Sequence, residues 1–314
     1  MSDAPPKRLL LGPQRPVRNL GDAIAAAGVP DGPLAVISAG WQEAEADTAD
    51  VAELAGRSLV DLRLYQRAEQ LFAADRDLYA AYRERQDRLV ALQRLYRRRL
   101  KHLSAAARDM LRIEDGSEMV AAEQRHAVAQ LRALDRHHLN RVEALYDEFR
   151  DAHPPETHPS IAEHRAAIEE AIGGCSAVLI TGGNVVVMMN RMRLFGLKRL
   201  LEGQHVIAWS AGAMVLAERI VLFHDRTPQG RREPELLAAG ACIVPGYVIL
   251  PDASRRLRLK DKPRVGLYSR RFAPDTCVVL DSGCSMSLRG VDLAGVNGAR
   301  RIDHDGRIER IRAA

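Results

Sequence analysis

The stretch His205-Val206-Ile207-Ala208-Trp209-Ser210-Ala211-Gly212-Ala213-Met214 decides the fold of this chain. An apolar run ends abruptly at Ser210 and a helix-forming run follows, which predicts a strand, a sharp turn and a helix with a hydroxyl at the turn. Small residues stand two positions before and after the serine, at Ala208 and Gly212, and they suit a turn whose backbone passes close to itself. Two interpretations stay open on these residues alone: a nucleophile elbow, or an ordinary turn with a helix-capping serine.

A second apolar run ends in the same way. Residues 177–180 have the composition of a buried strand, the pair Gly182-Gly183 follows, and a helix is predicted from Val185 to Leu201. In a parallel sheet both turns lie at the same edge, where ligands bind. We therefore expect Ser210 to face the Gly182-Gly183 backbone.

Further apolar runs alternate with helix-forming stretches. Before the glycine pair, strands are predicted at residues 8–12, 33–40 and 59–64, and helices at 17–28 and 41–54. After the serine, strand segments are predicted at 241–246, 247–251 and 277–281, with antiparallel hairpins at the sheet edge over 285–311. Strands that alternate with helices indicate an α/β fold, here a three-layer α/β/α domain with a mostly parallel sheet.

The alternation breaks between residues 66 and 151, which are helix-forming, highly charged and free of proline. Apolar residues recur there every seven positions, before and after a turn at Gly116, which predicts a long antiparallel helical hairpin. Four residues interrupt its apolar seam: Arg85, Arg99, Asp135 and His138. We therefore expect the hairpin to pack on itself or on a partner, and to protrude from a core that does not need it.

This break sets the expected domain boundaries. Residues 1–65 and 152–314 are assigned to the α/β domain, and residues 66–151 to the inserted hairpin. The basic residues between Arg94 and Lys101 are typical of a solvated helix face, so we expect no nucleic-acid partner. The hairpin is the expected surface for a homo-oligomer or a protein partner.

Composition restricts the remaining possibilities. The 314 residues are 46% hydrophobic, which suffices for a sizeable core, and only 4% aromatic, too few for a base-stacking platform. Four well-separated cysteines disfavour a metal site or a disulfide framework. No apolar run of about 18 residues exists, and residues 1–8 have no signal core. We expect a cytoplasmic protein with no membrane contact, no metal and no cofactor.

The two turns together resemble a known family. Gly182-Gly183-Asn184, the helix that follows, and the run ending in Ser210-Ala211-Gly212-Ala213 are similar to the pattern of peptidase family S51, the dipeptidase E and cyanophycinase group. This group is a branch of the class I glutamine amidotransferase-like fold, and the resemblance covers roughly residues 8–64 and 160–290. Glutamine amidotransferases proper carry cysteine at this turn, so Ser210 argues against glutaminase chemistry.

The resemblance implies a serine peptidase that acts on small aspartyl or β-aspartyl peptides. Ser210 would be the nucleophile, and the N–H groups of Gly183 and Ala211 would form the oxyanion hole. Asp225 lies in the segment where the family has its acidic catalytic residue.

The base position departs from the family pattern. Where a histidine is expected after Leu250-Pro251, this chain has Asp252. A carboxylate is a poor base for a serine because its intrinsic pKa lies far below that of imidazole, and loss of a triad base costs on the order of 10³–10⁶-fold in rate. His224 is an alternative base, although a surface position beside Asp225 is the plainer interpretation.

Four residues are candidates for substrate binding: Gly182, Asn184, Arg255 and Arg256. Asn184 either binds a carboxylate or amide of the substrate or caps the following helix. The two arginines either contact an acidic group of the ligand or are solvated at the start of a helix. The expected ligand is a small peptide or another acidic molecule.

We therefore expect an S51-like serine peptidase relative whose activity is weak or lost. The alternative is a catalytically silent pseudoenzyme that serves as a ligand-binding module, or as an assembly module through the hairpin. The residue at position 252 distinguishes these expectations, because an active peptidase needs a base there and a binding or assembly module does not.

Overall fold

A computed structural model describes residues 5–225 and 233–312. Its main sheet has seven strands in the order β11-β10-β1-β5-β4-β2-β3. Strands β1 to β5 are parallel, whereas β10 and β11 form an antiparallel hairpin at the edge next to β1, as the tail sequence predicts. The strands are β1 (Lys7–Leu11), β2 (Leu34–Ile37), β3 (Leu59–Asp61), β4 (Ala177–Ile180), β5 (Val206–Trp209), β10 (Ser285–Arg289) and β11 (Asp292–Asn297).

Both faces of this sheet are covered by helices. Alternate residues of each strand point to opposite faces, so Leu9 and Leu11 belong to one apolar cluster and Leu10 to the other. The first cluster includes α1 (Leu20–Ala27) and α2 (Ala49–Ala55). The second includes α3 (Leu64–Ala74), α6 (Pro159–Gly173), α7 (Val185–Leu194) and α8 (Leu197–Glu202). The predicted three-layer α/β class is thereby confirmed.

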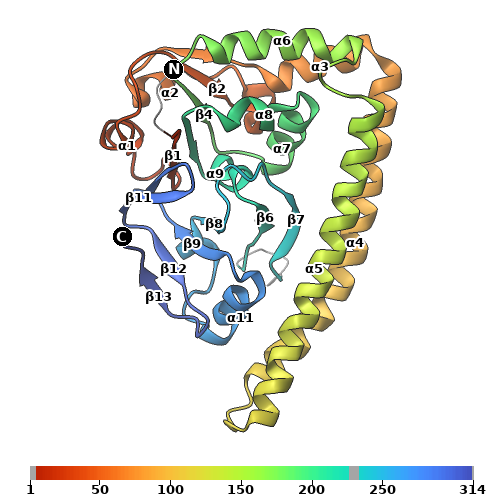
Figure 1. Ribbon diagram of the computed structural model, residues 1–314, viewed down its shortest axis with the longest axis vertical. Helices are drawn as coiled ribbons and strands as arrows, with labels where there is room; N and C mark the ends of the chain where they lie inside the picture. Colours follow the sequence, from red (N-terminus) through yellow and green to blue (C-terminus); the bar gives the residue numbers. More distant parts are fainter. Residues whose placement is uncertain (1–4, 226–232, 313–314) are drawn as a thin grey trace.

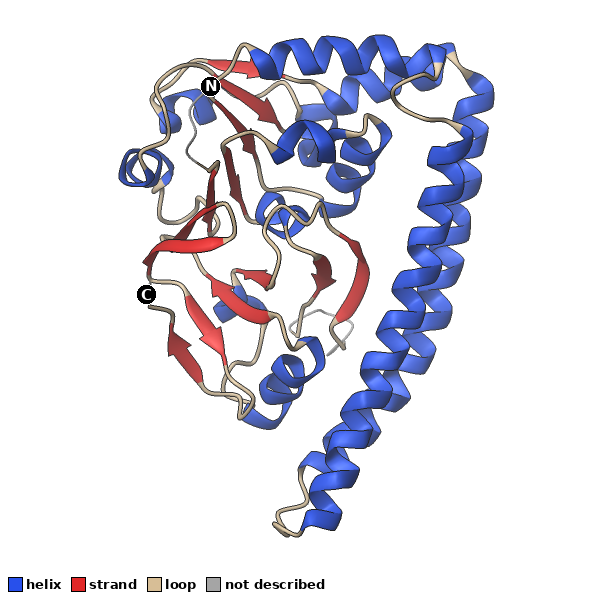
Figure 2. Ribbon diagram, viewed as in Figure 1, coloured by secondary structure: helices blue, strands red, loops and turns tan. Residues whose placement is uncertain are grey.

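The C-terminal strands form two smaller sheets that the sequence did not indicate (Figure 2). One is a four-stranded sheet of β8 (Tyr247–Pro251), β9 (Thr276–Leu280), β12 (Arg300–Ile302) and β13 (Ile308–Arg310). The other pairs β6 (Arg219–Leu222) with β7 (Glu235–Ala239). The strand predicted at 241–246 is wrong, because only an isolated bridge at Val244 is formed there.

Two predicted helices are interrupted. The helix expected over 185–201 divides into α7 and α8 at Gly196, whose φ of 64° is left-handed and ends a helix. The helix expected over 41–54 is replaced by a 3₁₀ segment, η1 (Ala39–Ala44), followed by α2. The remaining short helices are α9 (Ala211–Leu216), α10 (Ala253–Arg256) and α11 (Lys262–Phe272).

The long hairpin is present and consists of α4 (Arg76–Leu111) and α5 (Glu118–Ala152). Asp75 caps α4 by accepting a hydrogen bond from Leu78 N at 2.9 Å, and Ser117 caps α5 in the same way. Gly116, with a φ of 70°, forms the turn between them.

Within residues 5–225 and 233–312, no helix combines the length and the apolar character that crossing a membrane requires.

The hairpin packs against the α/β domain along most of its length, which corrects the expectation of a protruding arm; that the core does not need it stays a prediction. It runs along one side of the molecule, and only its tip extends beyond the rest (Figure 1). Residues of α4 and α5 share one apolar cluster with the main sheet and α11. Three of the residues that interrupt the apolar seam, Arg85, Asp135 and His138, are buried. Asp135 pairs with Arg271 of α11, whereas Arg85 and His138 contact side chains of the hairpin itself.

A buried ion pair joins the hairpin to α11. Arg271 donates to both carboxylate oxygens of Asp135, at 2.6 and 2.7 Å, and to Tyr96 Oη at 2.6 Å. Arg271 also donates to the carbonyl oxygen of Pro234 at 2.7 Å, and the amide of Leu236 donates to Tyr96 Oη. The side chains of Tyr96, Asp135 and Arg271 are all buried. Removal of one charge of the ion pair would therefore leave the opposite charge buried without a partner.

Asp135→Leu is expected to lower the free energy of unfolding by about 3–5 kcal/mol, because Arg271 would remain as an unpaired buried cation. The double variant Asp135→Leu/Arg271→Met is expected to recover most of that loss. Urea unfolding measures both values. Arg88→Met is the matched control, because the Arg88–Glu148 ion pair joins α4 to α5 on the exposed surface, where solvent screens it, so its loss should change stability far less. Equal losses in Asp135→Leu and Arg88→Met would contradict the role of the buried pair.

His138 is a second buried polar group of the hairpin. The side-chain amide of Gln93 donates to Glu235 and to Leu236 O, so its oxygen accepts from His138 Nε2 at 2.9 Å. The imidazole also stacks on Tyr96, with ring centroids 4.0 Å apart. His138 Nδ1 has no hydrogen-bond partner among the described residues. Burial lowers the pKa of His138 to about 4 from an ordinary value of 6.5.

Because the unfolded chain takes up this proton near pH 6.5 and the folded protein near pH 4, stability should fall as pH falls through that window. The His138 contribution has a slope of at most about 1.4 kcal/mol per pH unit. His138→Gln should flatten the pH dependence of urea unfolding between pH 6.5 and 4. His126→Gln, at an exposed position of the same helix, should leave the slope unchanged. An unchanged slope in His138→Gln would count against this assignment.

Candidate active site

Ser210 lies between β5 and α9, at the strand-to-helix turn that the sequence predicts. Its φ of 50° and ψ of −116° are rare for a residue with a side chain, so the expected strained backbone is confirmed. The amide of Ser210 donates to Leu11 O at 3.2 Å, and its carbonyl accepts from Met214 N at 3.1 Å. These bonds hold the half-buried hydroxyl at the carboxyl edge of the main sheet.

Gly212 is required by close packing of α9 on the end of β4. A Cβ atom at this position would lie 2.4 Å from Ile180 O and 2.6 Å from Thr181 O. No side chain fits against two carbonyl groups at these distances, which is the physical reason for the small residue after the serine.

Gly212→Ala is therefore expected to destabilise the protein by about 1–3 kcal/mol and to displace Ser210. Gly173→Ala is the control, because a Cβ at Gly173 in the last turn of α6 meets nothing within 4 Å. We expect that change to be neutral or slightly stabilising. Thermal unfolding of both variants measures the difference, and similar melting temperatures would contradict the packing argument.

The Gly182-Gly183 turn lies directly beside Ser210, as expected. A Cβ at Gly182 would be 3.2 Å from Ser210 Cβ. Gly183 has a φ of 123°, and a Cβ there would lie 2.5 Å from Gly40 O at the end of β2. Within the described residues, the amides of Gly183 and Ala211 donate no hydrogen bond. Both groups are therefore available to an acceptor at Ser210.

A cavity of about 750 Å³ opens over this edge. Seven of the ten sequence-predicted site residues line it: Gly182, Gly183, Ser210, Ala211, His224, Asp252 and Arg256. Three do not: Asn184, Asp225 and Arg255. The structure thus brings Ser210, Gly183, Ala211 and Asp252 to the wall of one cavity.

Asp252 follows β8 in a left-handed conformation, with φ 57° and ψ 32°. Its amide donates to Leu280 O at 3.2 Å. Its carboxylate lies 3.4 Å from the guanidinium of Arg255 and 3.9 Å from that of Arg256. Position 252 therefore faces the same cavity as Ser210, with a carboxylate held in ion pairs.

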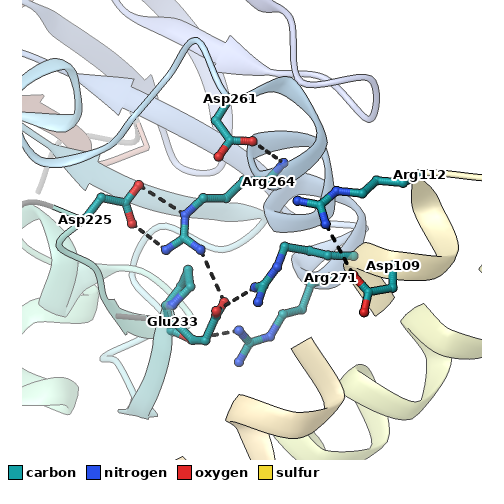
Figure 3. Close-up of polar contacts among 9 residues, drawn as sticks. Asp109, Arg112, Asp225, Glu233, Asp261, Arg264 and Arg271 are labelled. Carbon is teal, nitrogen blue, oxygen red and sulfur yellow. Dashed lines mark hydrogen bonds and ion pairs between the residues drawn. The ribbon is translucent and has the colours of Figure 1, made fainter. Parts of the chain in front are cut away.

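Asp225 is buried and lies outside the cavity lining. Its carboxylate forms an ion pair with Arg264 through both oxygens and accepts from the amide of Arg258 at 3.0 Å. Arg264 also reaches Glu233, which pairs with Arg108 of α4 at 2.6 Å (Figure 3). The structure gives Asp225 a structural partner and does not bring it to Ser210.

The other candidates are placed as follows. The side-chain oxygen of Asn184 accepts from the amides of Val186 and Val187, so this residue caps α7. Arg255 does not line the cavity, and its side chain is 80% exposed. His224 is exposed on the cavity wall, one residue after Phe223. Most of the polar loop predicted over 226–235 lies outside the described residues.

Sequence reasoning missed several charged residues of the cavity. Four distant segments supply them: Arg15 and Arg18, Asp47 and Asp50, Arg97, and Glu233 and Glu235. Arg97 comes from the basic cluster of α4 and pairs with Glu235 at 2.6 Å. These charged residues are present in the sequence, but no local sequence pattern indicates that they come together at one cavity.

Part of the chain matches a known protein family. The model of peptidase family S51 matches residues 133–261, a span that includes Gly182, Ser210, Asp225 and Asp252. The chain is also similar to a crystal structure of a peptidase from an acI-B1 Actinobacterium, with 12% identity, a TM-score of 0.44, and coverage of 99% of this chain and 95% of that one. No sequence among curated proteins matches.

The structure is that of an α/β protein. The match over residues 133–261 confirms the resemblance of that part of the chain to peptidase family S51.

Proposed function

We propose that this protein binds a small acidic peptide over Ser210 and hydrolyses it weakly at most. One observation carries the proposal. The cavity is lined by Ser210 and by two residues whose amides donate no hydrogen bond, Gly183 and Ala211, and it has Asp252 where a catalytic histidine is expected. Among the described residues, no side chain forms a hydrogen bond with the Ser210 hydroxyl. An unactivated hydroxyl is a weak nucleophile at neutral pH.

Four arginines and five carboxylates line the cavity, and the support for an acidic ligand comes from two of the arginines. Arg97 and Arg256 are neutralised by Glu235 and Asp252. Arg15 and Arg18 also line the cavity, are exposed, and form no ion pair within the described part of the chain. These two guanidinium groups are suited to a ligand carboxylate, because arginine binds carboxylates in a bidentate geometry.

In the proposed complex, the ligand carbonyl lies over Ser210 and accepts hydrogen bonds from Gly183 N and Ala211 N. Attack by Ser210 Oγ would form a tetrahedral intermediate and release the hydroxyl proton. A histidine at position 252 would accept that proton, whereas Asp252 is a poor acceptor. The ligand is thus bound in a reactive geometry, but the proton transfer is not assisted.

Labelling of Ser210 by a fluorophosphonate tests this proposal. We expect slow labelling of the native protein, and at least about a tenfold faster reaction in Asp252→His because imidazole restores a base. The double variant Ser210→Ala/Asp252→His should not react. Arg255→His is the matched control, since it adds a histidine three residues away but outside the cavity. Peptide mapping by mass spectrometry locates the label.

Two results would contradict this assignment. Rapid labelling of the native protein that is lost in His224→Gln would identify His224 as an active base. Absence of labelling in every form, together with no binding of an aspartyl dipeptide in calorimetry, would exclude a peptide site at Ser210. If the dipeptide binds, Arg15→Met/Arg18→Met should weaken its affinity by about tenfold or more.

The second candidate function is assembly through the hairpin. Met119 is 78% exposed and Ile113 is 43% exposed, and both lie at the tip of α4 and α5. Exposed apolar side chains at the end of a rigid arm support a contact with a second copy or another protein. Sedimentation of the native protein and of Ile113→Ser/Met119→Ser tests this candidate, which fails if both are monomers and no partner is found.

A further inference from the structure

A second cavity of about 770 Å³ lies between the hairpin and the α7–α8 region. It shares no lining residue with the cavity at Ser210. The short helix α9 separates the two, with Met214 on the wall of the first and Val215 on the wall of the second. The second cavity is therefore a distinct site, large enough for a small organic molecule.

Arg85 of α4 lines this cavity and is only 4% exposed. Its guanidinium lies over the rings of Tyr82, Tyr146 and Phe149, at 4.6, 5.0 and 4.2 Å from their centroids. Its Nε and Nη2 atoms have no hydrogen-bond partner, and no carboxylate of the described residues pairs with it. Burial lowers the pKa of Arg85, which reflects the cost of this charge in the interior.

The neighbouring charges leave one cation uncompensated. Arg191 pairs with Glu69 at 2.6 Å, and Arg193 pairs with Glu143 through two bonds of 3.0 Å. Arg191 and Arg193 both lower the pKa of Arg85 by their positive charge. Three guanidinium groups thus share two carboxylates. Aromatic rings stabilise a buried cation, but they accept no conventional hydrogen bond from its N–H groups.

The rest of the cavity is suited to an apolar body. Met189, Met192, Leu197 and Val215 line it and are buried, and methionine side chains adapt to ligands of irregular shape. The exposed charged residues of the lining carry both signs and lie toward the solvent: Arg150, Asp151, Glu156, Lys198, Arg199 and Glu218. The cavity therefore combines an unpaired cation, an aromatic wall and an apolar lining.

We propose that this cavity binds a small organic monocarboxylate with an apolar body. The carboxylate lies beside the Arg85 guanidinium and supplies the missing negative charge, and the apolar part packs on Met189 and Met192. The ligand would contact both the hairpin and the α/β core. This site is independent of the proposed chemistry at Ser210.

Calorimetry with 3-phenylpropionate tests the proposal on the full chain, with the uncharged 3-phenylpropionamide and inorganic phosphate as comparison probes. We expect saturable binding of the carboxylate, and at least about tenfold weaker binding of both other probes. Arg85→Met should abolish the preference for the carboxylate over the amide. Without ligand, Arg85→Met should have a free energy of unfolding equal to or higher than that of the native protein, because an unpaired buried charge is removed.

Three controls keep the outcome decisive. Arg88→Met removes an exposed arginine of the same helix and should leave binding unchanged. Arg256→Met, in the first cavity, should also leave it unchanged. If Arg85→Met does not fold, Ala241→Phe fills the cavity without a change of charge and should block binding. The proposal is overturned if the native protein does not distinguish the carboxylate from the amide, or if the preference survives in Arg85→Met or binding survives in Ala241→Phe.

Discussion

The site depends on one constraint: at the carboxyl edge of the main sheet, backbone packs directly on backbone. The ends of β2, β4 and β5 meet there, and Asn184 N donates to Gly40 O at 2.8 Å across the junction. A Cβ at Gly183 or Gly212 would approach a carbonyl oxygen to 2.5 Å or less. Glycine is thus the only residue that lets these loops meet, and their contact fixes the strained turn at Ser210.

The hairpin shows how an insertion can become part of a core. Its buried polar residues would be unfavourable in an isolated pair of helices, because a buried charge without a partner is costly. Two of them are satisfied by α11 and β7, where Asp135 meets Arg271 and Gln93 meets Glu235. These directional contacts set one position of the hairpin on the α/β domain, whereas apolar contacts alone would tolerate sliding along the seam.

The sequence predicted the features that depend on local pattern. Apolar runs and small residues located β4, β5 and the turn at Ser210, and the seven-residue repeat located α4 and α5. It did not predict the separate four-stranded sheet, because the residue pattern of a short strand such as β12 does not specify which strand it pairs with. It also did not predict the convergence of Arg15, Arg97 and Glu235, since side chains far apart in sequence meet only through the tertiary fold. The role expected for Asp225 rested on chain order, which cannot reveal that Arg264 competes for the carboxylate.

Helix α4 connects the two cavities. Arg85, Gln93 and Tyr96 stand at positions i, i+8 and i+11, so they lie on the same face of the helix, toward the core. Arg85 lines the second cavity, Gln93 and Tyr96 belong to the buried polar network, and Arg97 reaches the cavity at Ser210. The 36 residues of α4 thus contribute to the walls of both cavities. The insertion is a shared wall of the two cavities, and the surroundings of Ser210 are built by the hairpin as well as by the α/β core.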